Sequence, residues 1–215
     1  MSLLYIIKRW FDEKYLSLHA ARRYSRLLLN IKVTLYLARL SVSLHTAKCA
    51  TMKKMITDDM LRQAAEEGMD AFLKVFTDAY LTRIEGELTA ETMPRLTGTQ
   101  HALLGYHFFH EEMMDGGFCQ LIQNGYGPYI FDNPFAKAMR LWGLKEFSKV
   151  IYKAKEVYDE HKADLTRERS DEEFMAMYEL YPQFDDPEDY FIENEEEITA
   201  TIAYYVDEHI EEFLI

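Results

Sequence analysis

The sequence predicts an all-α fold: a compact acidic domain of six or seven helices at residues 52–215, preceded by a basic helical segment at residues 1–51. Three observations support this prediction. Apolar residues recur at helical spacing almost everywhere after Thr57. Strand signals are weak, because the Asn-Gly pair at 124–125 lies beside a helical run rather than between alternating segments. A hydrophobic share of 48% over 215 residues provides for one sizeable core.

Charge divides the chain at about residue 54. Residues 1–54 hold eleven Lys and Arg against two acidic residues, a formal charge of +9, whereas residues 55–215 hold thirteen against thirty-five, a formal charge of −22. Such an acidic body repels phosphates and suits a basic protein surface or metal ions. Two cysteines cannot make a disulfide framework, so we expect a reducing cytoplasm.

The basic segment at 1–51 has two interpretations. Its apolar run is interrupted by charges and is a poor membrane span, and its first residues lack the order of a signal peptide. It could be an amphipathic arm that lies on a membrane or folds onto the acidic body. Alternatively, it could reflect a start codon placed too far upstream, which we favour because Met52 directly precedes a capped helix in "TMKKMITDDML".

The first helices follow from their caps and breaks. Thr57 or Asp58 can cap a helix whose apolar face extends as far as Tyr80. Gly86 and Pro94 then interrupt the pattern. The sequence predicts a second helix from about residue 99 to residue 114.

The second half of the chain has clearer signals for where helices begin and end. Asn133 is the expected N-cap of a short helix, with Pro134 at its first position and Gly143 past its end. A longer helix follows over about 144–165. "SDEE" at 170–173 is a capping box whose helix ends before Pro182. The last helix is predicted from about residue 195 to the C-terminus.

The stretch "DGGFCQLIQNGYG" at 115–127 could be a ligand cradle, a catalytic loop or a structural joint. Its glycines do not follow the spacing of phosphate-binding or dinucleotide-binding loops. They fit two sharp corners around one short helix that buries Phe118, Leu121 and Ile122. Cys119 lacks a nucleophile signature and fits a small buried residue. We therefore predict a structural joint.

The same stretch resembles the signature of the DNA-mimic-protein-19-like family. In that family an acidic residue and usually an asparagine precede Gly-Gly-Phe; Asp115 stands here where the asparagine is usual. The segments "FDDPEDYF" and "YYVDEHIEEF" are similar to later parts of the family, and the resemblance covers about residues 57–213. The matching signature positions are Glu112, Gly116, Gly117, Phe118, Gln120, Asn124 and Gly127.

Residues 185–197 form the most acidic stretch and are the predicted partner-binding surface. As a helix, eight carboxylates over thirteen residues at about 1.5 Å each give one charge per ~2.4 Å, against about 1.7 Å of axis in B-DNA. An extended chain would not reach that density. An acidic run is more commonly only a solvated face. The eight are Asp185, Asp186, Glu188, Asp189, Glu193, Glu195, Glu196 and Glu197.

The resemblance implies an acidic binding protein that acts as a DNA mimic. It would occupy the DNA-binding surface of a basic partner, such as a helix-turn-helix transcription regulator, and would form a homodimer. We expect no catalytic residue, metal ligand or cofactor. We also expect that the chain binds neither nucleic acid directly nor a membrane. The alternatives are an interaction module with an unknown partner, or a helical enzyme with a His/Glu metal site at His107 and Glu111, although "HFFHEEMM" matches neither a zinc-protease nor a di-iron pattern.

Overall fold

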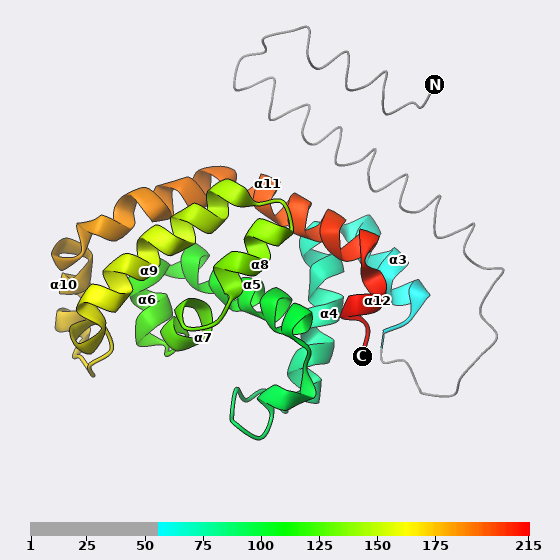
Figure 1. The fold of residues 1–215 in the computed structure, drawn as a ribbon, viewed down its shortest axis with the longest axis horizontal. Helices are drawn as coiled ribbons and strands as arrows, with labels where there is room; N and C mark the ends of the chain where they lie inside the picture. The colour runs from blue at the N-terminus through cyan, green and yellow to red at the C-terminus, as the bar shows by residue number, and fades with distance from the viewer. Residues whose placement is uncertain (1–55) are drawn as a thin grey trace, which may run out of the picture. The chain divides into compact units, whose positions relative to one another are not determined.

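The structure is a computed structural model that describes residues 56–215, and it confirms the all-α prediction for that part of the chain (Figure 1). Within these residues it contains ten α-helices, two short 3-10 helices and no strand. The larger number than the predicted six or seven arises from one helix that breaks and from short helices near residues 127 and 210. The predictions for residues 1–51 lie outside the described residues.

The first predicted helix is two helices, α3 (Asp58–Glu67) and α4 (Met69–Arg83). The Thr57 hydroxyl caps α3 by accepting a hydrogen bond from the N–H of Met60 at 3.3 Å, as predicted. The backbone leaves the helical conformation at Gly68, whose φ is 142° and ψ −179°. The apolar pattern continues through this break, because both helices bury the same kind of side chain, and so periodicity alone did not show it.

Helix α5 (Gly98–Asp115) is the central helix of the domain and contacts α4, α6, α8 and α11. It starts at a capping box in which the Thr97 hydroxyl accepts from the N–H of Gln100 and the Gln100 side chain accepts from the N–H of Thr97. A short 3-10 helix, Met93–Arg95, precedes this box. Figure 1 shows α5 crossing the middle of the domain beneath α9 and α11.

Three short helices follow: α6 (Gly117–Gln123), α7 (Gly127–Phe131) and α8 (Phe135–Leu141). The predicted N-cap at Asn133 is wrong by one residue, since Pro134 precedes the first residue of α8. Instead, the Asn133 amide donates to the carbonyls of Pro128 and Tyr129, both at 3.2 Å, and so satisfies the end of α7.

The remaining helices are α9 (Lys145–Leu165), α10 (Asp171–Leu180), α11 (Asp185–Glu208) and α12 (Ile210–Phe213). The predicted capping box at Ser170 and Glu173 is confirmed, with hydrogen bonds of 3.3 and 3.0 Å. A 3-10 turn, Pro182–Phe184, leads into α11. Helix α11 begins at Asp185 rather than near Glu195. Pro187 does not prevent this, because it falls in the first turn, where a missing N–H breaks no helical hydrogen bond.

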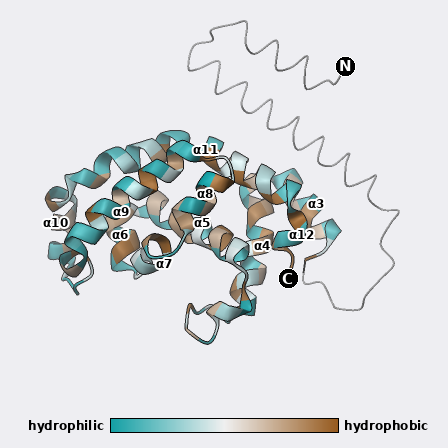
Figure 2. Ribbon diagram, in the orientation of Figure 1, coloured by the Kyte–Doolittle hydropathy of each residue, from teal (hydrophilic) through white to brown (hydrophobic). Residues whose placement is uncertain are grey.

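Aromatic rings join the helices in the core. The ring of Phe109 in α5 lies 5.0 Å from that of Phe191 in α11 and 5.4 Å from that of Phe147 in α9. Phe118 and Phe135 each lie 5.8 Å from the same ring. Such pairs contribute about 0.5–1.5 kcal/mol each beyond the burial of apolar area. Figure 2 shows that the first half of α11 is mostly hydrophilic, whereas α10 mixes hydrophilic with apolar residues, of which Met175 and Leu180 are exposed.

The C-terminus is anchored to the first half of the domain. The Tyr80 hydroxyl donates to the carbonyl of Phe213 at 2.6 Å, and the Gln100 amide donates to that of Leu214 at 3.0 Å. None of the described helices has the length and hydropathy that a bilayer crossing requires.

Candidate partner-binding surface

The acidic segment is helical throughout, because residues 185–197 all lie in α11. At about 100° of rotation per residue, six of its carboxylates fall within an arc of about 120°. All six residues are exposed. We call this surface the acidic face; it consists of Asp185, Asp186, Asp189, Glu193, Glu196 and Glu197.

The other two carboxylates lie on the opposite side of α11, so the expectation that all eight share one outer surface is wrong. Glu188 and Glu195 are partly buried and share the inner side with Phe191 and Ile198. The spacing 188, 191, 195, 198 is that of a helical stripe facing the core. Carboxylates are rare at such positions unless they have partners, and both have them.

The acidic face has a lower charge density than the full set of eight. Six charges between residues 185 and 197 span roughly 18 Å of helix, or one per ~3 Å. That spacing is close to the ~3.4 Å between phosphates along one strand of B-DNA, and wider than the ~1.7 Å of the whole duplex. The mean charge density of the face is therefore closer to that of one phosphate strand than to that of the duplex.

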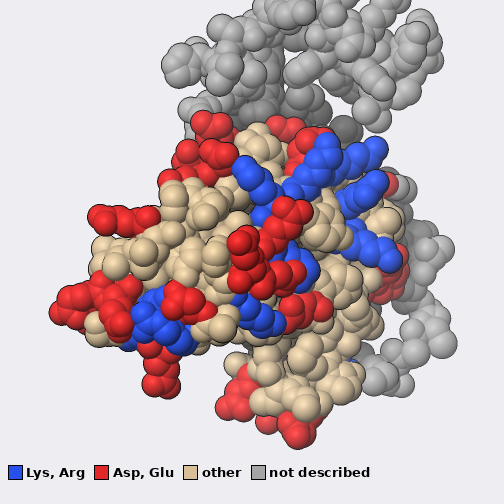
Figure 3. Space-filling model, turned by 60° about the vertical axis from the view of Figure 1, so that its left-hand side comes forward, with Lys and Arg blue, Asp and Glu red and all other residues tan. Residues whose placement is uncertain are grey.

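Basic residues border the acidic face. The Lys153 ammonium of α9 lies 3.0 Å from the Asp186 carboxylate. Figure 3 shows Lys and Arg side chains interspersed with Asp and Glu on one side of the molecule. The chain after Arg169 is different: from Ser170 to Ile215 it has sixteen acidic residues and no Lys or Arg.

Glu188 connects the first turn of α11 to the glycine stretch. Its Oε1 accepts a hydrogen bond from the backbone N–H of Phe118 at 2.7 Å. Gly117 has φ 69°, in the left-handed region, and a Cβ there would collide with the Glu188 carboxylate. Burial raises the pKa of Glu188, Asp185 and Asp189 raise it further, and the bond from Phe118 opposes them.

Hydrogen bonds across the two corners of the glycine stretch hold α6 in place. The Asn124 amide donates to the Glu112 carboxylate at 2.8 Å, and the Gln120 amide donates to that of Asp115 at 2.6 Å. The Tyr178 hydroxyl donates to the carbonyl of Gly116 at 2.9 Å. These contacts are those of a joint that links α5, α6, α10 and α11.

Close packing accounts for another glycine of the stretch, and burial explains its cysteine. A Cβ at Gly127 would lie 2.8 Å from the Tyr158 ring. Cys119 is buried, and burial raises the pKa of its thiol to about 12, which leaves it protonated and a poor nucleophile.

Comparison with known proteins matches the part of the chain that contains both the joint and the acidic face. Residues 94–209, from just before α5 to just after α11, match the model of the family described as "DMP19-like protein". The chain belongs to the DMP19-like family. A curated relative, "DNA mimic protein DMP19" of Neisseria meningitidis serogroup B (strain ATCC BAA-335 / MC58), is 31% identical over 144 residues, which are 66% of this chain and 87% of the relative.

Membership of the DMP19-like family confirms the resemblance drawn from the sequence. The sequence alone did not predict two contacts of this DMP19-like chain, which are the Lys153–Asp186 ion pair and the Tyr178–Gly116 hydrogen bond. Each joins residues at least thirty positions apart, and no short-range pattern marks them. Only the lysines of α9 could have indicated the first.

The structure gives little support to the alternative metal site at His107 and Glu111. His107 Nε2 and Glu111 Oε2 lie 3.7 Å apart on one face of α5. Among the described residues, no third ligating side chain completes a group with them. The pKa of His107 is lowered mainly by burial, so its imidazole is neutral at pH 7. The pair has the geometry of an ordinary i, i+4 contact along a helix, with His107 partly buried and Glu111 exposed.

Proposed function

We propose that this chain is a binding protein, not an enzyme, which occupies the DNA-binding surface of a basic protein and so competes with DNA. The observation that carries the proposal is the acidic face: six exposed carboxylates on one side of α11, at about the spacing of phosphates along one DNA strand. The name of the relative from Neisseria meningitidis, a DNA mimic protein, supports it.

The inner side of α11 makes the acidic face stiff. Phe191, Ile198 and Ile202 are each at most 2% exposed, and the first turn is fastened through Glu188. A stiff row of charges loses little conformational entropy when a partner binds. The partner's lysines and arginines would gain attraction and faster association from the face, much as they do from DNA.

A helix-turn-helix regulator is the partner class that we propose. Such proteins contact phosphates on both sides of the groove that their recognition helix enters. One acidic face would cover the contacts to one strand, and a homodimer of this chain would present two faces. We place this competition in the cytoplasm, where a bacterial DNA-binding regulator works.

The test is competition with DNA after the partner has been captured. The chain is used as bait in its native extract at low and high salt, and the captured protein is tested for release of its DNA. The face variant changes all six carboxylates of the acidic face to Asn or Gln. The control variant makes the same change at six exposed acidic residues outside α11: Glu66, Glu67, Glu87, Glu91, Glu168 and Glu179.

We expect the face variant to bind the partner at least about tenfold more weakly, which corresponds to about 1.4 kcal/mol. The control variant should bind nearly as the unchanged chain does at moderate salt, because distant exposed charges are screened. Equal losses in the two variants would show that net charge, and not the acidic face, drives binding, and would overturn the proposal.

A further inference from the structure

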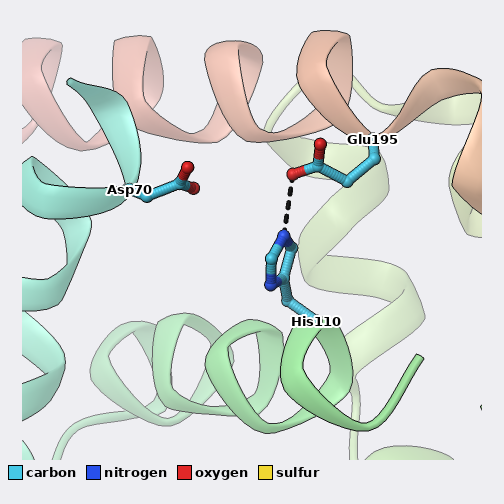
Figure 4. Close-up of side chains that lie close together, drawn as sticks. All are labelled: Asp70, His110 and Glu195. Carbon is cyan, nitrogen blue, oxygen red and sulfur yellow. Dashed lines mark hydrogen bonds and ion pairs between the residues drawn. The ribbon is translucent and has the colours of Figure 1, made fainter. Parts of the chain in front are cut away.

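Three side chains that can ligate a metal meet behind the acidic face: Asp70 of α4, His110 of α5 and Glu195 of α11. One ligand atom from each lies within 4.8 Å of the other two. His110 Nε2 and Glu195 Oε1 are 2.7 Å apart. Figure 4 shows the three side chains pointing toward one another from three separate helices. Residues distant in sequence are thus brought to one point by the packing of the bundle.

A second layer of hydrogen bonds orients the Glu195 carboxylate. The Thr199 hydroxyl donates to its Oε1 at 2.9 Å, and the Tyr106 hydroxyl lies 2.6 Å from that of Thr199. Tyr106 and Thr199 are buried. Ligands of protein-bound metals are commonly held by such outer partners, which fix their orientation.

The cluster combines two carboxylates with one imidazole. No Lys or Arg of residues 56–215 forms an ion pair with Asp70 or Glu195. A bound cation would relieve the repulsion between the two carboxylates.

We propose that Asp70, His110 and Glu195 form a binding site for a divalent first-row transition cation, with Zn²⁺ as the probe. An imidazole nitrogen with two carboxylate oxygens suits such ions, whereas Mg²⁺ and Ca²⁺ favour ligand sets made wholly of oxygen. Tetrahedral zinc with bonds of about 2.0–2.1 Å holds its ligand atoms roughly 3.3 Å apart. On binding, the 2.7 Å distance between His110 Nε2 and Glu195 Oε1 would lengthen, and the ligand-atom distances of up to 4.8 Å would shorten.

The cation would clamp α4, α5 and α11 together, with Asp70 exposed and His110 and Glu195 partly buried, and would leave one coordination position for water. Because it would hold the helix that carries the acidic face, its binding should raise the melting temperature of the chain. This inference is independent of the proposed function, since it concerns the inner side of α11 and holds whichever partner the outer side binds.

The test measures ion binding to the full chain by titration calorimetry and thermal unfolding, with Zn²⁺ and Mg²⁺ in parallel and Co²⁺ as a spectroscopic probe. The ligand variants are Asp70→Asn, His110→Gln and Glu195→Gln. The matched controls are His107→Gln, a histidine one turn away on α5, and Glu193→Gln on the acidic face. Circular dichroism reports whether each variant is folded.

We expect Zn²⁺, but not Mg²⁺ at the same concentration, to raise the melting temperature of the unchanged chain. Each ligand variant should lose one high-affinity equivalent of Zn²⁺, and His110→Gln should lose the visible absorption of bound Co²⁺. Both controls should bind as the unchanged chain does. No stoichiometric Zn²⁺ binding by the unchanged chain, or equal binding by His110→Gln and His107→Gln, would overturn the proposal. If a variant does not fold, the titration of the unchanged chain and its Co²⁺ spectrum still decide.

Discussion

The Glu188 carboxylate of α11 accepts a hydrogen bond at 2.7 Å from the N–H of Phe118, a residue seventy positions earlier in the chain. We predict that Glu188→Ala destabilises the fold by about 1–3 kcal/mol, because it leaves a buried backbone donor without a partner. Urea unfolding measures this loss. Glu193→Ala, an exposed change on the same helix, should stay within about 0.5 kcal/mol of the unchanged chain.

Glu188→Gln separates the hydrogen bond from the charge. The Gln side chain keeps an oxygen that can accept from Phe118, and it removes a partly buried charge. We expect the free energy of unfolding at pH 7 to stay within about 1 kcal/mol of the unchanged chain. A loss as large as that of Glu188→Ala would show that the charge itself is required.

The raised pKa of Glu188 predicts a pH effect of definite sign. When folding raises the pKa of a carboxyl above its unfolded value, the folded state binds the proton more tightly, and the resulting stability is lost as pH rises through the folded pKa. The loss should therefore begin near the ordinary value of 4.5 and continue above it. Unfolding of the unchanged chain and of Glu188→Gln is measured from pH 4 to 7. The free energy of unfolding of the unchanged chain, minus that of Glu188→Gln, should fall as pH rises. A rise of this quantity with pH would contradict the assignment.

Gly117 and Gly125 offer a matched pair. Both have positive φ, 69° and 85°, but a Cβ at Gly117 would collide with Glu188, whereas the space around Gly125 is open. Gly125→Ala should cost about 1 kcal/mol from its backbone conformation alone. Gly117→Ala should cost at least about 1 kcal/mol more, from overpacking. In a Glu188→Ala background the extra cost should largely disappear; its persistence would mean that the carboxylate is not the obstacle.

Lys153 partly neutralises the acidic face through Asp186. If the proposed function holds, Lys153→Ala should bind the basic partner more tightly, by about twofold to fivefold at low salt, because one carboxylate is released for the partner. Lys74→Ala is the control, since Lys74 pairs with Asp78 on α4 instead. Binding is compared at several salt concentrations, and the gain should shrink as salt rises. A weaker complex would show that Lys153 itself contacts the partner.

The sequence was sufficient for the local features. Caps at Thr57 and Ser170 mark helix starts that the structure confirms, because a cap depends on residues only three positions apart. The short helix α6 was predictable from the glycines around it and from the short apolar stripe between them. The two segments on either side of Gly68 were joined in error, since their apolar pattern continues across it.

The candidate site was predictable only in part. The predicted charge density required residues 185–197 to be helical, and all of them lie in α11. The count of eight outward carboxylates failed because composition does not reveal which side of a helix meets the core. Glu188 and Glu195 face inward, where Phe118 and His110 supply their partners from helices that the sequence alone could not place beside α11.

The inner side of α11 packs into the core, whereas the acidic face is exposed to solvent. Substitutions on the side with Phe191 and Ile202 disturb the core, whereas the acidic face makes no core contacts and its charges can be rearranged at little cost to folding. If the proposed function holds, relatives that keep the same scaffold can therefore diverge in their targets through a few surface codons. The same separation makes this helix a convenient place to engineer new binding preferences into the protein.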